Sequence, residues 1–513
     1  MYYTHIFKKC FADPATLESL CDTLIMTGLA NDIYSSQYTE EAEKFSGAFG
    51  IDKKLLSDAD ENDYIIIADT DSADKAELVF SRINSAITVK NPQQHVYHFS
   101  DPETAFSVHP DANFAVVNVS SQYAARVCVQ CLEHDLGLLV PSVISYEDEQ
   151  KMKEIALLKG LPMLGGGVAG ALIGDVALGA CPRFTKGNTA VIGPSFTANM
   201  YAAFLLERSG IGIRHIISTG RRDYFTAELG RMTKYCIDML NDDPETSTIV
   251  FILKAGDIEI INDVVDYAKN HSDKKIYFYG AGRLKTGQFT ANMDSEDSVP
   301  ALVGRICEDV GLPLPELLSD ADAEAMASGY RSRISTAQKY VRGFLLSDAM
   351  CGEVISSLQQ SIGTIYSNRP IKSSSMLQDA RSLKENSIID YGHRSLTPTC
   401  RAAFQASLSR NRRLVAESYN RTVAVLIADW YGGEGCTEAY LNNLADSIRR
   451  CISNAAADGR TIAVAVIAAT GEYSPVSYQK TFETLKAAGA EVFSNADDAA
   501  LFASHLLKTT EVN

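Results

Sequence analysis

Three segments of this chain carry glycine residues where a short apolar run ends, and two of the segments add hydroxyl residues. The first contains Gly165, Gly166 and Gly167. Glycine lets a backbone approach a ligand closely and adopt positive φ. The N–H groups of such a loop can meet an anionic or carbonyl group. The same glycines also fit a turn that crosses between two sheets, and both interpretations stay open on this segment alone.

The second segment, residues 188–210, places Gly193, Ser195 and Thr197 between an apolar run and an amphipathic helix. Ser195 or Thr197 can cap that helix. A helix N-terminus with free N–H groups and hydroxyls attracts anions. The pattern therefore fits either an anion site or a plain N-cap, which stabilises a helix by about 1 kcal/mol.

The third segment, residues 213–230, continues from an apolar run into Thr219, Gly220, Arg221 and Arg222. These residues follow a predicted strand, and open α/β sheets bind ligands beyond the carboxyl ends of their strands. Guanidinium groups suit bidentate contacts with carboxylate or phosphate. The alternative is that both arginines pair with neighbouring acidic side chains on the surface. Two such loops at one sheet edge favour a binding site for a small anion.

Candidates for acid–base chemistry are fewer. His393 follows a short apolar run in a predicted loop, and Glu434 follows a strand and a Gly-Gly turn. Histidine titrates near neutral pH, so His393 is the better candidate for an acid or base, although an ordinary loop also fits. His215 lies within an apolar strand and is interpreted as a core histidine. The catalytic residue itself stays unassigned.

Composition excludes several classes of function. The net charge of −17 argues against nucleic acid as the main partner. The sequence has no apolar run of the roughly 20 residues that a membrane span needs, and its start does not resemble a signal peptide. We therefore expect a cytoplasmic protein with reduced cysteines. Cys128 and Cys131 lie in a helical pattern without further ligands at zinc spacing, so no metal site is predicted.

Short apolar runs alternate with amphipathic stretches, which predicts βα units. We predict an α/β protein of several three-layer domains with mainly parallel sheets. Polar stretches at residues 69–113 and 294–338 indicate domain boundaries. The predicted buried strands are Tyr64–Ala68, Ala115–Val119, Leu138–Val140, Ala190–Ile192, His215–Ile217, Ile249–Leu253, Lys275–Tyr279, Val423–Ala428, Ile462–Ala468 and Glu491–Phe493.

The order of these segments resembles the α subunit of succinyl-CoA ligase and, more closely, the FdrA proteins. Residues 111–160 resemble the latter half of a CoA-binding domain. Ser195 and Thr197 match the family's Ser-Gly-Thr phosphate helix, in which Phe196 here replaces the glycine. The stretch HIISTGRRD resembles the family's Gly-Thr-Gly-Gly-Arg-Asp loop, and Gly165 matches the glycine of its Gly-Pro turn. YVRGF, residues 340–344, resembles the opening of the C-terminal half of FdrA proteins.

The resemblance implies a sequence of domains. It predicts an N-terminal α/β domain over residues 1–90 and a CoA-binding-like Rossmann domain over 91–185. A succinyl-CoA ligase-like, flavodoxin-type domain follows over 186–310. A linker over 311–338 then leads to a second flavodoxin-type domain over 339–513.

One departure from the family concerns its phosphohistidine. The ligase carries its phosphoryl group on a histidine, and Gln288 stands in the equivalent segment here. A glutamine side chain is not nucleophilic and cannot relay phosphate. The glycine-rich loop of a CoA-binding domain is not visible either. CoA or a nucleotide remains a possible ligand, and no cofactor is assigned.

The resemblance implies three functions, which the residues leave open. FdrA proteins are associated with carbamoyl transfer involving oxamate in allantoin and purine breakdown, together with partner proteins. On this hypothesis the ligand is a small anion such as carbamoyl phosphate, oxamate or an acyl phosphate, and we expect a partner subunit or a homo-oligomer. The alternatives are an ADP-forming acyl-CoA synthetase and a non-catalytic scaffold subunit.

Overall fold

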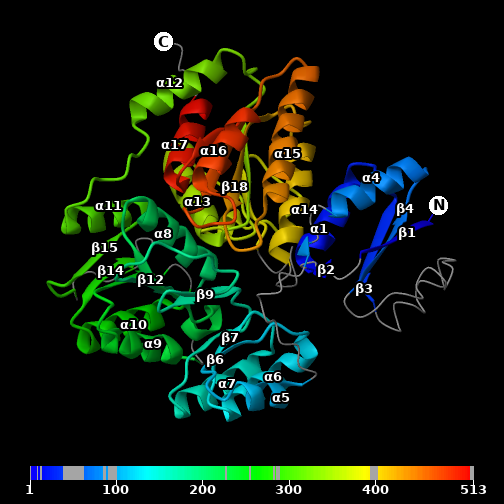
Figure 1. Ribbon diagram of the computed structural model, residues 1–513. Helices are drawn as coiled ribbons and strands as arrows, with labels where there is room; N and C mark the ends of the chain where they lie inside the picture. Colours follow the sequence, from blue (N-terminus) through cyan, green and yellow to red (C-terminus); the bar gives the residue numbers. More distant parts are fainter. Residues whose placement is uncertain are drawn as a thin grey trace. The chain divides into compact units, whose positions relative to one another are not determined.

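The computed structural model describes residues 2–7, 10–11, 14–38, 63–84, 88–89, 101–225, 228–253, 256–280, 284, 289–392 and 402–508. The chain divides into two compact units, residues 1–100 and 101–513 (Figure 1). Each unit is described by itself. In the described part of the chain, no helix has the length and apolar character that crossing a membrane requires.

The first unit is built on an antiparallel sheet in the order β1(Tyr2–Phe7), β4(Tyr64–Asp69), β3(Asp32–Gln37). Side chains alternate across a strand, so Ile66 and Ala68 enter a cluster with residues of the helices α1(Pro14–Met26) and α4(Ala73–Asn84). A two-residue strand, β2(Cys10–Phe11), pairs with β5(Thr88–Val89). The strand predicted at residues 64–68 is confirmed, although its neighbours run antiparallel to it.

The second unit begins with a parallel sheet of β6(Phe114–Val116), β7(Gly137–Val140) and β8(Met163–Gly165). The helices of this region are α5(Pro102–Val108), α6(Ser121–Glu133) and α7(Tyr146–Leu158). Cys128 and Cys131 of α6 are buried, and burial raises the pKa of their thiols to about 12 and about 11. Both thiols therefore stay protonated and serve as small apolar groups in the core.

A larger sheet follows, in the order β10(Val176–Gly179), β9(Gly170–Ile173), β12(Ile213–Ser218), β11(Thr189–Gly193), β13(Thr248–Ile252), β14(Lys275–Tyr279), β15(Met293–Glu296). The strands from β12 to β15 are parallel, and β9 and β10 form an antiparallel hairpin at one edge. Its helices are α8(Phe196–Arg208), α9(Arg231–Asp242), α10(Ile258–His271) and α11(Val299–Val310).

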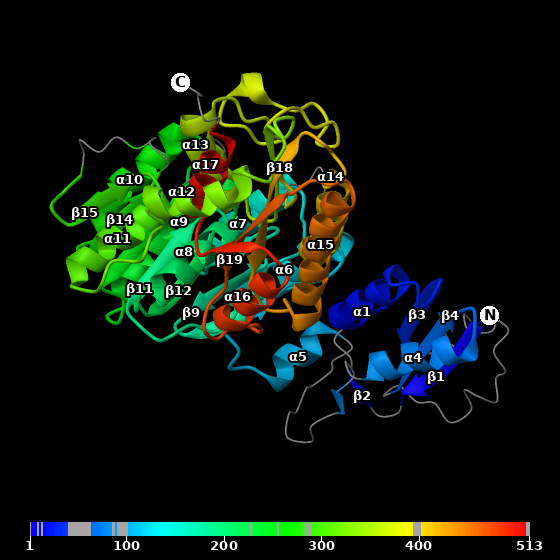
Figure 2. The ribbon, with the colours of Figure 1, turned by 90° about the horizontal axis from the view of Figure 1, so that it is seen from above.

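The last sheet is parallel and has the order β17(Ser387–Asp390), β16(Tyr340–Leu345), β18(Val423–Tyr431), β19(Ala463–Ala469), β20(Glu491–Phe493). Its helices are α13(Asp348–Ile362), α14(Ala402–Glu417), α15(Glu438–Ala457), α16(Tyr478–Ala487) and α17(Ala496–Leu507). Figure 2 shows α13 and α17 side by side. The predicted fold class, α/β with several mainly parallel sheets, is confirmed.

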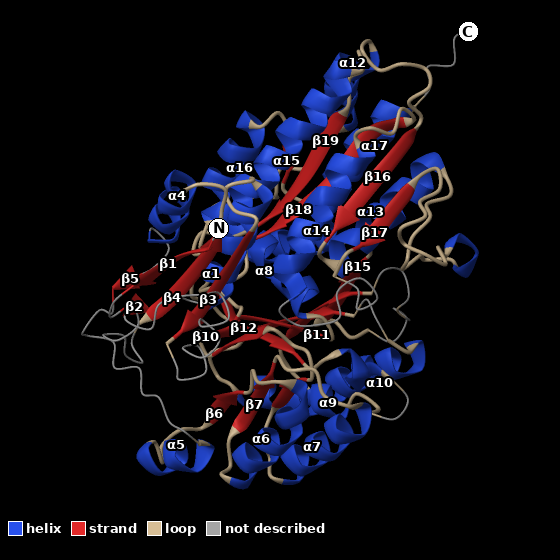
Figure 3. Cartoon of the chain, turned by 90° about the vertical axis from the view of Figure 1, so that its right-hand side faces the viewer, coloured by secondary structure: helices blue, strands red, loops and turns tan. Residues whose placement is uncertain are grey.

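Helix α8 connects the two larger sheets. Most of its residues are buried on every side, which is expected only for a helix inside a core. One hydrophobic cluster contains Phe204 of α8, Val354 of α13 and Phe502 of α17. Figure 3 shows α8 between the strands of the two sheets. This shared core fixes the N-terminus of α8 relative to the N-terminus of α13.

Candidate functional site

The three predicted glycine loops lie next to one another in the structure. Gly165 ends β8, and Gly193 ends β11. The backbone N–H of Thr219 donates to Gly193 O at 3.3 Å. A Cβ atom on Gly220 would lie only 3.4 Å from Gly165 Cα. Gly165, Gly167 and Gly220 have positive φ angles of 107°, 83° and 90°, which a side chain would strain. The loops after β11 and β12 therefore lie at one sheet edge, as expected, and the end of β8, a strand of another sheet, adjoins them.

Among these loops, the guanidinium of Arg222 is bound by the carboxylate of another residue of the chain, Glu149. Arg222 Nη1 donates to Glu149 Oε2 at 2.7 Å. On the other side, Lys153 Nζ lies 3.1 Å from Glu149 Oε1 and donates to Thr219 O at 3.0 Å. Glu149 and Lys153 are each only 1% exposed. The alternative of a surface pair with a neighbouring acidic side chain, Asp223 or Glu228, therefore has the wrong partner for Arg222, which pairs with buried Glu149, 73 residues away in the sequence.

The remaining residues of this loop serve the local structure. Arg221 is exposed on the short 3-10 helix η1(Arg221–Tyr224). Asp223 is fully buried and accepts hydrogen bonds from Met232 N at 3.2 Å and Thr233 N at 2.9 Å. Asp223 therefore satisfies N–H groups in the first turn of α9.

Ser195 is the N-cap of α8, as predicted, and accepts from Ala198 N at 3.4 Å. Its hydroxyl donates to Asp348 Oδ1 at 2.9 Å. Thr197 Oγ1 donates to the same oxygen at 3.2 Å. Asp348 is the first residue of α13 and follows the N-cap Ser347. The N-termini of the two helices therefore meet at one carboxylate.

A partly buried arginine, Arg369, completes this arrangement. Arg369 Nη1 donates to Asp348 Oδ2 at 3.2 Å and to Asp390 Oδ2 at 2.9 Å. Burial lowers the pKa of Arg369, but the two carboxylates outweigh it and raise that pKa overall, so the guanidinium stays charged. We name the set of Ser195, Thr197, Asp348, Arg369 and Asp390 the α8–α13 junction.

The α8–α13 junction stabilises negative charge. The positive end of the α8 dipole and two hydroxyl donors point at an oxygen of Asp348, and a guanidinium binds its other oxygen. Such a set of donors also suits a carboxylate or phosphate of a ligand. It contains no histidine or thiol, so its chemistry is binding and charge stabilisation.

Sequence reasoning missed Asp348, Arg369 and Asp390. A signal was present for the first, because Leu345–Asp348 repeats the strand-to-N-cap pattern of Gly193–Ser195. Nothing in the sequence pairs the two patterns, since 153 residues separate Ser195 from Asp348.

Phe196, which replaces the family's glycine, points away from the junction toward the hairpin. A Cβ on Gly170 of β9 would lie 2.8 Å from the far end of the Phe196 ring. Phe196 is 6% exposed. The Phe196 ring therefore fills the space in the hairpin that Gly170, which has no side chain, leaves open.

The predicted candidate His393 lies outside the described residues, as does Gln288 of the segment equivalent to the family's phosphohistidine. Glu434 is exposed, and its backbone N–H donates to Ala180 O at 2.9 Å. Its loop thus packs on the segment after β10. Among the described residues, no cluster of three or more His, Cys, Asp and Glu side chains could hold a metal ion.

The residues after β6 do not form a cradle for a CoA pyrophosphate. A glycine-rich loop is what lets such a group approach the backbone. Here the chain continues as Val117-Asn118-Val119-Ser120. Ser142 Oγ accepts from Val119 N at 2.8 Å and donates to Val119 O at 2.6 Å, which ties the loop to the end of β7. We derive no step through CoA.

Comparison with known proteins identifies sequence relatives of this chain. The uncharacterized protein YahF of Escherichia coli (strain K12) is 25% identical over 458 residues, which cover 88% of each chain. The α subunit of succinate–CoA ligase [ADP-forming] of Aquifex aeolicus (strain VF5) is 27% identical over 179 residues. That match covers 33% of this chain and 57% of the subunit, so the chain spans little more than half of that relative. No family model matches.

Solved structures with similar elements superpose weakly. A dinucleotide-forming acetyl-coenzyme A synthetase 1 of Ca. Korarchaeum cryptofilum, in complex with phosphate and ADP, gives a TM-score of 0.27 at 16% identity. The superposition covers 77% of this chain and 82% of the synthetase chain. ATP citrate lyase from Methanothrix soehngenii gives 0.31 at 14% identity, covering 44% and 45%. Superpositions this weak carry no conclusion about function. By sequence the chain is YahF-like over most of its length, with homology to the succinate–CoA ligase α subunit over a third of it.

Proposed function

We propose that this acyl-CoA synthetase-related protein is a subunit of an enzyme that transfers a carbamoyl or another acyl group. In this proposal the α8–α13 junction binds the negative group of a small substrate such as carbamoyl phosphate, oxamate or an acyl phosphate. The observation that carries the proposal is that two hydroxyls at the N-terminus of α8 and an arginine converge on one carboxylate, Asp348, at the start of α13.

The carboxylate of Asp348 occupies the place of a ligand oxygen. Ser195, Thr197 and Arg369 are donors to it, and hydrogen bonds to a charged group contribute about 1.5–3 kcal/mol each. If the Asp348 side chain turns away, all three donors become available to a substrate anion. Binding of that anion therefore competes with a group of the protein itself.

The transfer itself needs no protein nucleophile. In the oxamate case, the oxamate nitrogen attacks the carbamoyl carbon, the bond from that carbon to the phosphate oxygen breaks, and the nitrogen loses a proton. Inorganic phosphate leaves with the negative charge that the donors of Ser195, Thr197 and Arg369 would stabilise. Holding the two reactants together and stabilising the leaving charge are sufficient sources of rate.

The test is calorimetric titration of the full-length protein with carbamoyl phosphate, oxamate and acetyl phosphate. Asp348→Asn removes the competing charge and is expected to lower the Kd about tenfold, equivalent to about 1.4 kcal/mol. Ser195→Ala is expected to raise the Kd by a similar factor, because a donor to the anion is lost.

A matched control separates ligand binding from helix capping. Ser298 caps α11 and accepts from Ala301 N at 3.3 Å, so Ser298→Ala loses an N-cap outside the α8–α13 junction. We expect Ser298→Ala to bind the anions like the unaltered protein. No heat with any of the three compounds, or an equal effect of Ser298→Ala, would contradict the proposal and favour a scaffold subunit whose donors serve only the fold.

The match to a succinate–CoA ligase [ADP-forming] subunit supports a second candidate, an ADP-forming acyl-CoA synthetase. With Gln288 in place of the family histidine, that reaction needs another residue to carry the phosphoryl group. Mass spectrometry after incubation with ATP and CoA would locate it. An unmodified chain, together with no thermal shift from CoA or nucleotides, would count against this candidate.

A further inference from the structure

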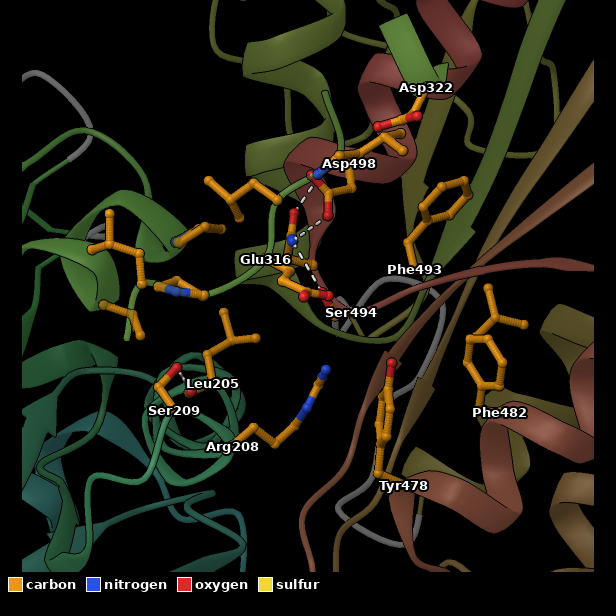
Figure 4. Close-up of a pocket in the computed structure, with 18 of the residues that line it drawn as sticks. Leu205, Arg208, Ser209, Glu316, Asp322, Tyr478, Phe482, Phe493, Ser494 and Asp498 are labelled. Atoms are coloured by element: carbon orange, nitrogen blue, oxygen red, sulfur yellow. Dashed lines mark hydrogen bonds between the residues drawn. The ribbon is translucent and has the colours of Figure 1, made fainter. Parts of the chain in front are cut away.

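A second site lies at the other end of α8, away from the α8–α13 junction. A cavity of about 710 Å³ is lined by the C-terminal residues of α8, the segment 313–318, helix α16 and the start of α17 (Figure 4). Cavities of this size accommodate small organic ligands. The cavity shares no residue with the α8–α13 junction.

Arg208 supplies a cation to this cavity. Its guanidinium lies 3.7 Å from the centroid of the Tyr478 ring, and both side chains project into the cavity (Figure 4). Arg208 keeps an exposed surface there, while the surrounding protein removes it from water enough to lower its pKa against the opposing effect of Tyr478. No carboxylate among the described residues forms an ion pair with it. A guanidinium held on a ring without a counter-ion is prepared to bind an anion.

Glu316 supplies an anion to the same cavity. It is exposed and forms no hydrogen bond or ion pair with the part of the chain that the structure describes. The other acids are engaged: Asp498 accepts from Leu318 N at 3.0 Å, and Asp322 accepts from Ser319 Oγ at 2.6 Å. Glu316 is therefore the carboxylate available to a ligand.

Part of the cavity lining is flat and apolar. Tyr478 and Phe482 of α16 have ring centroids 6.1 Å apart, and Phe493 of β20 lines the same cavity. Pro313 and Pro315 also line the cavity. Rings and prolines lose little conformational freedom when they contact a planar group.

We propose that this cavity binds a small zwitterion with a flat apolar body, of which an aromatic amino acid is the simplest example. The carboxylate of the ligand contacts Arg208, its ammonium faces Glu316, and its ring lies against the aromatic walls. The site is independent of the proposed transfer reaction, because it stands on a different cavity and on different charges.

Calorimetric titration of the full-length protein tests the ligand class. L-tryptophan and L-phenylalanine are the probes, and we expect one of them to bind with a Kd of about 1 mM or tighter. Indole-3-propionate lacks the ammonium, tryptamine lacks the carboxylate, and glycine lacks the ring. Each is expected to bind at least about tenfold more weakly than L-tryptophan, because each loses one of the contacts.

Variants then locate the site. Arg208→Gln and Glu316→Gln are each expected to weaken binding of the best probe about tenfold. Arg333→Gln is the matched control, because Arg333 also stacks on a tyrosine, Tyr330, at 5.4 Å but does not line the cavity. The proposal is overturned if neither amino acid binds at about 5 mM, if indole-3-propionate binds as tightly as L-tryptophan, or if Arg208→Gln has no more effect than Arg333→Gln.

Discussion

Lys153 shows how a single buried charge positions a loop of the glycine cluster. It lies on α7, is 1% exposed, and binds both the Glu149 carboxylate and the carbonyl of Thr219. A charge taken out of water is tolerated only where it is paired and hydrogen-bonded. Lys153 therefore joins helix α7 to the loop after β12.

Removing this lysine leaves Glu149 buried with one cation fewer. We expect Lys153→Met to lower the free energy of unfolding by about 3–5 kcal/mol, the cost of breaking a buried ion pair. Urea unfolding followed by circular dichroism measures it. Lys159→Met is the control, because Lys159 pairs with an exposed Asp135 at 2.6 Å and such pairs contribute about 1 kcal/mol or less. Equal losses in both variants would refute this role of Lys153.

Residue types and short spacings predicted what is local in the site. The N-cap at Ser195 follows from the residue before a helix. Glycine is needed at positions 165 and 220 because the two backbone segments approach each other closely there. The partners of Arg222 and Ser195 did not follow, because Glu149 and Asp348 are distant in sequence and reach the site only through packing of whole helices. Any donor can be satisfied by a ligand or by the protein, and spacing alone does not distinguish the two.

At the scale of elements, His215 connects β12 to the hairpin β9–β10. The prediction of a core histidine is confirmed, since His215 is 6% exposed. Gly174 N donates to its Nδ1 at 3.2 Å, and its Nε2 lies 3.0 Å from Asp243 Oδ2. A nitrogen that accepts a hydrogen bond carries no proton, so this geometry requires the neutral ring with the proton on Nε2.

Acid should weaken this connection. Burial lowers the pKa of His215, with Asp243 opposing that effect, so its folded pKa lies below the unfolded value of about 6.5. The unfolded chain then binds the proton more readily, and the stability contributed by neutral His215 is present above pH 6.5 and lost as pH falls through the folded pKa. Between pH 7 and 5 we expect a loss of up to about 1.4 kcal/mol per pH unit. Urea titrations at both pH values should show a smaller loss for His215→Gln, and an equal loss would contradict this assignment.

The elements that the sequence predicted share one property, a continuous apolar run. Strands such as β13 and β18 are buried on both faces, so their sequences are largely apolar. The hairpin β9–β10 was not predicted, although its Gly174-Asp175 turn has positive φ at both residues, the geometry of a tight hairpin. Within the expected linker, α12(Asp320–Arg331) forms and packs against α17.

At the scale of the whole molecule, the order of βα units was predictable and the meeting of α8 with α13 was not. Parallel strands separated by helices specify a sheet with its loops at one edge. How two such sheets pack against each other depends on which helices are apolar on all of their faces. Helix α8 has that composition, with Ala202, Ala203 and Phe204 all buried. Helical spacing alone did not reveal which neighbour covers it.

The division into two compact units predicts that residues 101–513 fold without the first hundred residues. The hydrophobic clusters of the first unit consist of residues between 6 and 83, and those of the second unit of residues between 106 and 507. Trp430 is the sole tryptophan of the chain and lies buried in β18, so its fluorescence reports on the second unit. We expect a 101–513 fragment to unfold in urea at the same midpoint as the full chain, within about 0.5 kcal/mol in free energy. A 186–513 fragment is the control, because it removes the strands β6–β10 and with them Lys153 and the Met163 backbone contact to Met232. That fragment should unfold earlier by several kcal/mol, about the loss expected when a packed layer of the core is exposed. If the 101–513 fragment unfolds as early as the 186–513 fragment, the two units are one cooperative structure.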